Sequence, residues 1–238
     1  MDTADARVLD LLGTGELEVV GRLTDASNAT FLYRVAGGAD DTLCVYKPRR
    51  GERPLDDFPH GTLGNRERAA YLVSESTGWR IVPPTVLRDG PFGPGMVQAW
   101  IETDPDVDVL EMVMTGDERL RSIAIFDAIS NNADRKGSHL LPTESGAIYG
   151  VDHGICFSAD PKLRTVLWAW RGQSLDHGEL QVVDRVRVAL EGELSAPLCD
   201  LLDEHEIRAT VRRAQQLLDS ARFPEPDPTR PAVPWPPF

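Results

Sequence analysis

The character of the chain changes near residues 101–106, and this change limits its possible folds more than any other feature. Short runs of β-branched and aromatic residues, separated by turn-forming residues, fill the first part. They lie at 16–22, 30–35, 43–47, 83–88 and 96–101, with one helical segment among them at 65–77. Helical periodicity then dominates, at 106–114, 117–130, 179–194 and 203–222. Strands and helices that are segregated in this way predict an α+β protein rather than an alternating parallel-sheet fold.

The same change predicts the domain organisation. With 238 residues the chain is long enough for one large domain or two small lobes. We expect a β-rich N-terminal lobe at 1–103 and a mainly helical C-terminal lobe at 104–222. The segment 223–238 holds seven of the 18 prolines, which predicts an extended or disordered tail, or a strap on the surface.

Composition excludes several classes of function. The formal net charge of −13 argues against a general nucleic-acid or anionic-membrane binder, because both need a basic face. No apolar run approaches the ~20 residues that cross a bilayer, and the acidic start lacks a signal-peptide pattern. We therefore expect a cytoplasmic protein without an integral membrane segment. The three cysteines, at 44, 156 and 199, suit neither a disulfide framework nor a zinc site.

Two carboxylates in neighbouring loops suggest a chemistry. Asp134 lies in the polar loop Asn-Asn-Ala-Asp-Arg-Lys that follows an apolar helix, and Asp152 lies eighteen positions later in Val-Asp-His-Gly, after a short strand. Phosphoryl transfer needs one acid to orient the acceptor hydroxyl and another to hold a metal ion on the nucleotide phosphates. The alternative is two solvated aspartates in turns, which are common in an acidic protein.

Lys47 adds a cation to this pattern. Only three lysines occur against 22 arginines, and Lys47 ends the otherwise apolar strand at 43–47. A lysine retained there is a candidate for binding nucleotide phosphates and for pairing with Glu67 of the helix at 65–77. The alternatives are an edge-strand lysine with its head in solvent, and a first-turn helix acid.

Six short motifs follow one another along the chain: Val45-Tyr-Lys-Pro48, Glu67-Arg-Ala-Ala-Tyr-Leu-Val73, Val82-Pro-Pro-Thr85, Gln98-Ala-Trp-Ile-Glu102, Asn132-Ala-Asp-Arg135 and Val151-Asp-His-Gly154. In this order they resemble the motifs of the phosphatidylinositol 3/4-kinase branch of the protein-kinase-like fold. The resemblance is closest to type II phosphatidylinositol 4-kinases, through an actinobacterial branch with distant lipid-kinase similarity, and spans roughly residues 20–157. The resemblance implies a bilobal kinase-like fold that uses ATP with Mg²⁺ or Mn²⁺.

The resemblance also implies roles for individual residues. Lys47 would contact nucleotide phosphates, and Gln98 and Trp100 lie in the segment that resembles the hinge between lobes. Asp134 would be the catalytic base, or the residue that positions the acceptor hydroxyl, and Asp152 would be the metal ligand. His139 stands where the family has a metal-binding asparagine, five positions after Asp134. Because Mg²⁺ prefers oxygen ligands, a histidine there favours Mn²⁺ or reduces activity.

Three further residues are candidates with open alternatives. Arg135 could neutralise phosphate charge in catalysis or only brace its loop. Ser27 and Asn28, between the first two strands, could cradle phosphate through backbone N–H groups and small polar side chains, or form a plain β-turn.

The sequence therefore predicts an ATP-dependent phosphotransferase of the phosphatidylinositol 3/4-kinase-like type. Its acceptor could be a small molecule, a lipid headgroup or a protein hydroxyl. The first alternative is a pseudokinase, which binds a nucleotide or a partner with little turnover. The second is a scaffold that binds no nucleotide.

Overall fold

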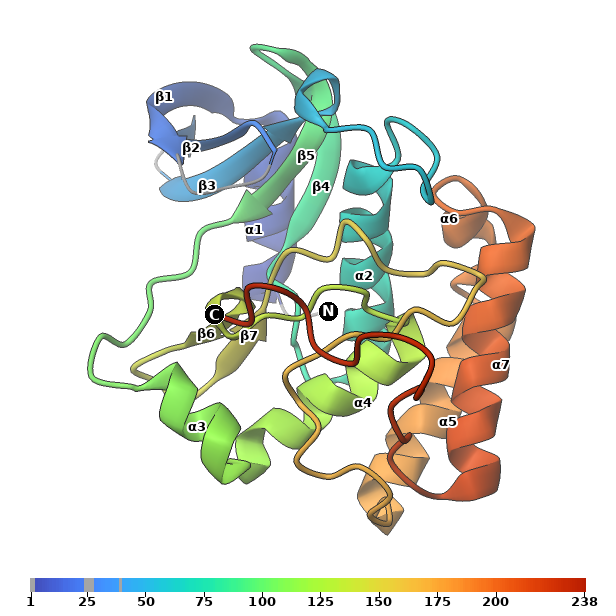
Figure 1. The fold of residues 1–238 in the computed structure, drawn as a ribbon. Coiled ribbons are helices and arrows are strands. Elements are labelled where there is room, and N and C mark those ends of the chain that lie inside the picture. The colour runs from blue at the N-terminus through green and yellow to red at the C-terminus, as the bar shows by residue number, and fades with distance from the viewer. Residues whose placement is uncertain (1–2, 24–27, 39) are drawn as a thin grey trace.

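Five antiparallel strands form the sheet of the N-terminal lobe, in the order β1-β2-β3-β5-β4 (Figure 1). They are β1 (Glu16–Leu23), β2 (Thr30–Gly37), β3 (Asp40–Pro48), β4 (Thr85–Gly90) and β5 (Gly93–Ala99). The structure, a computed structural model, describes residues 3–23, 28–38 and 40–238. All five strands predicted from the sequence are present, with ends that differ by a few residues.

The side chains of β3 alternate between the two faces of the sheet, as the pleat requires. Cys44 and Tyr46 are completely buried on one face. They pack there with Leu12, Tyr33, Val35 and Val97. Lys47 consequently points from the opposite face, where it can meet other parts of the chain.

Helix α1 (Thr3–Thr14) packs against this sheet and was not predicted. Its Leu12 is completely buried in the sheet's core. The spacing of Val8, Leu11 and Leu12 is the helical signal that could have revealed it.

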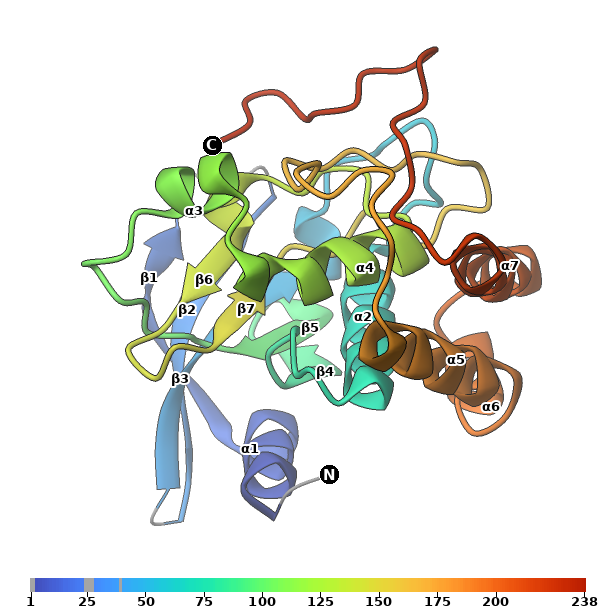
Figure 2. The same cartoon turned by 90° about the horizontal axis from the view of Figure 1, so that it is seen from below.

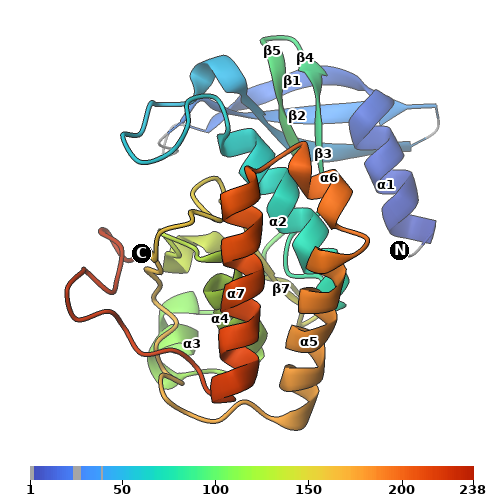
Figure 3. The same ribbon diagram turned by 90° about the vertical axis from the view of Figure 1, so that its right-hand side faces the viewer.

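The C-terminal lobe consists of helices and one short hairpin. Its helices are α3 (Val109–Thr115), α4 (Arg121–Ser130), α5 (His177–Glu191), α6 (Ser195–Cys199) and α7 (Glu204–Ser220), and its hairpin is β6 (Leu140–Pro142) with β7 (Ile148–Gly150). Figure 3 shows α5 and α7 side by side. Both begin with a capping box, in which Asp176 pairs with Glu179 and Asp203 with Glu206. The predicted long helices are confirmed, whereas α6 was not predicted.

Helix α2 (Leu63–Thr77) connects the two lobes. Its Ala69, Ala70 and Val73 are fully buried in the main hydrophobic core. That core also contains the apolar side chains of α4, of which Ile125 and Phe126 are completely inaccessible. A residue on another side of α2, such as Glu67, is therefore held in place by the C-terminal lobe while it contacts Lys47 of β3.

The residues 223–238, here called the C-terminal strap, run over the surface of the C-terminal lobe. Figure 2 shows the strap leaving the end of α7 and passing over the loops drawn in orange. The carbonyl of Ala232 accepts hydrogen bonds from Thr165 N at 3.0 Å and from Trp168 Nε1 at 2.9 Å. The carbonyl of Pro237 accepts one from Gly137 N at 2.8 Å. The strap alternative of the sequence prediction therefore describes this segment.

The lobe bounds at 103/104 and 222/223 remain predictions; the first falls in the extended segment between β5 and α3. None of the described helices combines the length and the apolar character that a membrane-spanning helix needs.

Candidate active site

Lys47 on β3 joins the two lobes electrostatically. Its Nζ lies 2.7 Å from Oε1 of Glu67 on α2 and 2.8 Å from Oδ1 of Asp152 in the loop after β7. The Glu67 side chain is only 2% exposed, and its Oε2 accepts a hydrogen bond from His153 N at 2.9 Å. Burial would lower the pKa of Lys47, but the charges of Asp152 and Glu67 raise it above its usual range. The structure thus brings together three predicted site residues that lie up to 105 positions apart in the sequence.

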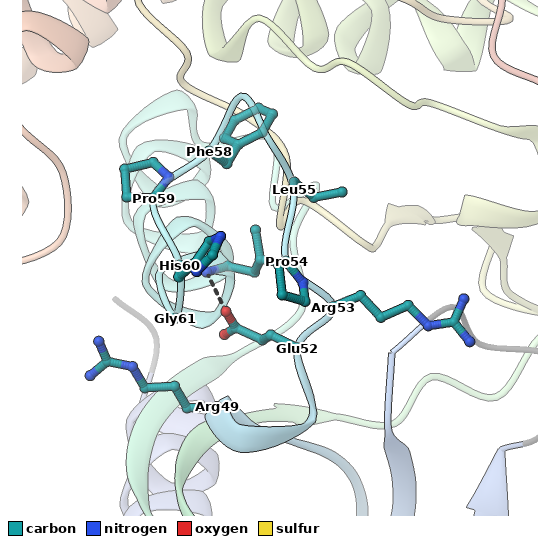
Figure 4. Close-up of a pocket in the computed structure, with 10 residues that line it drawn as sticks. Arg49, Glu52, Arg53, Pro54, Leu55, Phe58, Pro59, His60 and Gly61 are labelled. Atoms are coloured by element: carbon teal, nitrogen blue, oxygen red, sulfur yellow. Dashed lines mark hydrogen bonds between the residues drawn. The ribbon is translucent and has the colours of Figure 1, made fainter.

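The loop before α2 fixes the helix that carries Glu67. The sequence predicted this helix from residue 65, but it begins two residues earlier, at Leu63. The carboxylate of Glu52 accepts hydrogen bonds from Leu63 N at 3.2 Å and Gly64 N at 3.1 Å. Figure 4 shows Glu52 in this loop, with the first of these bonds as a dashed line. The first amides of a helix need such acceptors, and a negative charge there also suits the helix dipole. The hollow beside this loop, about 160 Å³ in volume, is too small for a nucleotide.

Two asparagines shape the loop that presents Asp134. Asn131 ends α4 in the left-handed conformation, with φ of 54°, and its side-chain amide donates to carbonyls of the segment 158–160. The amide of Asn132 donates to Asp127 at 3.0 Å, while its carbonyl oxygen accepts from Asp134 N at 3.0 Å. The backbone of the loop is thereby held by side chains rather than by a regular element.

Asp134 is partly buried and forms an ion pair with Lys136. Its side chain is 26% exposed, and Oδ2 lies 3.0 Å from Nζ of Lys136. Burial raises the pKa of Asp134, Lys136 opposes this rise, and the charge of Asp152 adds to it. The charge of Asp152 therefore acts on the ionisation of Asp134.

Arg135 is turned into the protein, away from Asp134. Its side chain is completely buried and forms a bidentate ion pair with Asp127, at 2.9 Å from Nη2 to Oδ1 and 3.0 Å from Nε to Oδ2. It also donates to the carbonyl of Val151 at 2.9 Å and contacts Nε2 of His153 at 2.6 Å. The guanidinium is thus fully occupied, which contradicts a direct contact with nucleotide phosphates. Arg135 braces the loop, which was the other interpretation of the sequence.

Asp152 and His139 form the predicted metal-binding pair. Asp152 has φ of 61°, a strained conformation for a residue other than glycine, and its side chain is 48% exposed. Its Oδ2 lies 3.4 Å from Nε2 of His139, and the charge of Lys47 chiefly lowers its pKa. Burial lowers the pKa of His139 to about 4, so the imidazole is neutral near pH 7.

The other four candidates lie away from this group or outside the described residues. Ser27 lies outside them. Asn28 accepts a hydrogen bond from Arg53 N at 2.9 Å, so its side chain holds a loop of the N-terminal lobe. Gln98 is buried and donates to Thr85 Oγ1 at 2.8 Å within the sheet. Trp100 Nε1 donates to Glu102 at 2.9 Å. Among the described residues, none of these three side chains forms a hydrogen bond or ion pair with Lys47, Glu67, Asp134 or Asp152.

Sequence reasoning missed Asp127, Glu52 and the contacts of His153. Asp127 is the one charged residue in the apolar run of α4, and that exception was the available signal. His153 is fully buried between Arg135 and Phe126. Glu52 carried no signal, because its partner amides lie across an irregular loop.

A comparison with solved structures bears on the fold. The chain is similar to the crystal structure of a Helicobacter pylori proinflammatory kinase, CtkA, with a TM-score of 0.50 and 12% sequence identity. The match covers 89% of this chain and 94% of the CtkA chain. This likeness establishes the fold alone, which is bilobal and protein-kinase-like.

A relative of much higher identity is the protein Rv2133c of Mycobacterium tuberculosis strain H37Rv. The two are 43% identical over 263 aligned positions, which include 96% of this chain and 94% of the relative. A comparison with protein-family models finds no match. Both the identity and the coverage are high, and the chain therefore belongs to the family of Rv2133c.

Proposed function

We propose that the chain is an ATP-dependent phosphotransferase. The observation that carries this proposal is the meeting of Lys47, Glu67 and Asp152 at 2.7 and 2.8 Å, beside the half-buried Asp134. Phosphoryl transfer involves little covalent chemistry for the protein, and its catalysts work by positioning and by neutralising charge. A lysine held by ion pairs can neutralise phosphate charge, and the two aspartates can position the metal ion and the acceptor hydroxyl.

Each residue has a distinct task in the proposed reaction. Lys47, oriented by Glu67, binds phosphate oxygens of ATP as a point charge. Asp134 accepts a hydrogen bond from the acceptor hydroxyl and aims it at the γ-phosphorus. Arg135 forms an ion pair with Asp127, which accepts a hydrogen bond from the Asn132 side chain that holds Asp134 N, so Arg135 helps to fix the loop that carries Asp134.

The donor atoms of Asp152 and His139 fit a divalent ion. The Asp152 carboxylate is half-exposed and supplies the hard oxygen that Mg²⁺ needs, while neutral His139 supplies a nitrogen better suited to Mn²⁺. The described residues contain no group of three or more His, Cys, Asp or Glu that could hold an ion alone. Nucleotide sites commonly bind Mg²⁺ through one or two carboxylates together with phosphates, so two side chains suffice. The bound ion would neutralise charge on the phosphates.

The test is ATP turnover by the full chain with Mg²⁺ and with Mn²⁺. Asp134→Asn and Asp152→Asn should each abolish turnover. The control is Asp200→Asn, which should leave turnover unchanged, because Asp200 is exposed and its side chain pairs with no other described residue. A thermal shift with ATP reports binding independently of turnover. ATP binding without turnover under either ion would instead support the pseudokinase, and no binding would support the scaffold.

We further propose that the enzyme is of the phosphatidylinositol 3/4-kinase-like type. Support comes from the order of the motifs around Lys47, Asp134 and Asp152. Transfer of labelled phosphate from ATP to an inositol-containing headgroup would support this assignment, and transfer to protein serine alone would contradict it.

A further inference from the structure

A hollow with a volume of about 1200 Å³ lies beside the catalytic loop. It is bounded by α7, by the segment 159–172 and by the first part of the C-terminal strap. Figure 3 shows the strap leaving the end of α7 and looping out to one side of this helix. Ala133, the neighbour of Asp134, is part of its lining. We call this space the strap groove.

The strap groove is positively charged although the chain has a net charge of −13. Six cationic and three acidic side chains line it. Lys162 pairs with Asp57 at 2.7 Å, and Arg230 lies 3.9 Å from Asp227. The remaining cations are Arg164, Arg212, Arg213 and Arg222. In the described part of the chain none of these four has a carboxylate within ion-pair distance, so the groove attracts anions.

Arg213 is held at the base of the groove by neutral groups only. It donates to the carbonyls of Ile129 at 2.8 Å and Ser158 at 3.1 Å, and to Thr210 Oγ1 at 2.8 Å. Burial lowers the pKa of Arg213 to about 10; the charge of neighbouring Arg212 also lowers it, whereas the charge of Glu206 opposes this fall. A largely buried cation with no carboxylate at ion-pair distance is costly, and a bound anion would offset that cost.

Arg164 is a second partly buried arginine without a carboxylate partner among the described residues, and it lies beside the catalytic loop. Its backbone N donates to the carbonyl of Asn132 at 2.9 Å, which fixes it beside the loop. Its Nε is buried and has no hydrogen-bond partner within the described residues. Its charge is among those that act on Asp134. Arg164 therefore lines the groove and also acts through its charge on the carboxylate of Asp134.

We propose that the strap groove is the acceptor site of this enzyme and takes a phosphate ester that bears a free hydroxyl group. Arg164, Arg212 and Arg213 bind its phosphate, because guanidinium groups match phosphate oxygens in charge and geometry. The hydroxyl then reaches Asp134 at the end lined by Ala133. This inference rests on the proposed phosphotransfer.

The transfer would proceed with a simple balance of bonds. A bond forms between the acceptor oxygen and the γ-phosphorus of ATP, and the bond from that phosphorus to the bridging oxygen of ADP breaks. The hydroxyl proton passes to solvent by way of Asp134. The products are ADP and an acceptor that carries one additional phosphate.

The ester could belong to a soluble molecule or to a lipid headgroup, and two probes distinguish these sources. The first is glycerol 3-phosphate, titrated calorimetrically into the full-length chain. The second is phosphatidylcholine vesicles with and without phosphatidylinositol, tested by co-sedimentation. Both are measured with and without a saturating non-hydrolysable ATP analogue, which separates the groove from the nucleotide's phosphate site.

Two groove variants and one matched control test the assignment. Arg212 is exposed and has no hydrogen bond or ion pair with the other described residues. Arg212→Gln and Arg164→Gln should each weaken binding of whichever probe binds by roughly tenfold, which is the cost of one charged hydrogen bond. Arg208→Gln, on the same helix but outside the groove, should bind like the unmodified chain. Failure of both probes to bind, or equal binding by all three variants, would overturn the site.

The failure of the proposed function would look different. Probe binding that depends on Arg164 and Arg212 in a chain that neither binds nor turns over ATP would overturn the acceptor role and the phosphotransferase assignment together. ATP turnover that persists without binding of either probe would leave the phosphotransferase standing and overturn only the groove. Asp134→Asn should retain probe binding, because its groove cations are unchanged.

Discussion

Nζ of Lys47 and Oε1 of Glu67 lie 2.7 Å apart, and this contact ties the sheet of one lobe to the core of the other. Lys47 comes from the face of β3 opposite Tyr46, whereas Glu67 comes from a helix whose apolar side is packed in the C-terminal lobe. The pair is therefore both a candidate phosphate-binding device and a structural link. Its energetics can be measured without knowing the acceptor.

Lys47→Met should destabilise the fold. The Glu67 carboxylate is 2% exposed, and Lys47 is the one cation within ion-pair distance of it among the described residues. Removing one partner leaves a buried charge without compensation, which typically costs 3–5 kcal/mol, and the 20% exposure of Lys47 reduces the expected loss to about 2–4 kcal/mol. Urea unfolding of both proteins measures it.

The double variant Lys47→Met/Glu67→Leu is the control for this interpretation. It removes both charges, so stability should recover toward that of the unmodified chain while ATP turnover stays absent. A single variant as stable as the unmodified chain would show that Glu67 finds another partner.

Local pattern accounts for much of the fold and for the members of the site, but not for their contacts. The strands and long helices have clear periodicities, and Lys47, Asp134 and Asp152 could be selected because each lies at a turn or strand end. The role of Arg135 could not be read in this way. Its partner Asp127 lies eight residues earlier on a buried helix, and only the three-dimensional packing turns the guanidinium inward.

The strap groove was equally hidden in the sequence. Arg164, Arg212 and Arg222 come from three separate segments, and each is unremarkable in its own surroundings. Their convergence depends on the path of the strap, which long-range hydrogen bonds such as Thr165 N to the carbonyl of Ala232 determine. Net charge averaged over the chain also concealed a local excess of cations.

Asp127→Asn should destabilise the protein by about 3 kcal/mol. Both side chains of the Asp127–Arg135 pair are completely buried, and an asparagine would leave the guanidinium charge uncompensated. His153, whose Nε2 lies 2.6 Å from Nη2 of Arg135, cannot replace the lost negative charge, because an imidazole is either neutral or cationic. Chemical denaturation measures the loss.

Asp41→Asn provides the comparison. Asp41 lies 2.7 Å from Arg34, but both side chains are more than half exposed, so the cost should stay below about 1 kcal/mol. Equal losses in the two variants would contradict the idea that burial makes the Asp127 pair critical.

His139→Asn should shift the metal preference of the reaction. Since the pKa of His139 is about 4, the residue offers a neutral nitrogen near pH 7, whereas asparagine offers a carbonyl oxygen. We expect the ratio of turnover with Mg²⁺ to turnover with Mn²⁺ to rise by about tenfold. Steady-state rates in each ion measure it, with His60→Asn, at an exposed histidine in the loop before α2, as control. An unchanged ratio would remove His139 from the metal site.

Asp134→Asn should make the protein more stable near pH 7 while removing turnover. Burial raises the pKa of Asp134 in the folded chain above its value in the unfolded chain, so the folded state binds this proton more tightly. Stability linked to that proton is present below the unfolded pKa and is lost as the pH rises through the folded pKa. The gain of the variant in Tm should therefore shrink as the pH is lowered. A variant less stable than the unmodified chain near pH 7 would show that the ion pair with Lys136 outweighs desolvation.

The three cysteines should differ sharply in reactivity. Cys44 and Cys156 are buried, whereas Cys199 is exposed at the end of α6. Burial raises the pKa of Cys44 to about 12 and that of Cys156 still further, so neither supplies a thiolate near neutral pH. A chromogenic disulfide reagent should therefore modify one thiol in the native protein and three after denaturation, and Cys199→Ser should abolish the native reaction. Rapid native labelling of Cys156, whose backbone carbonyl accepts a hydrogen bond from Arg66, would mean that the core between α2 and α7 opens under native conditions.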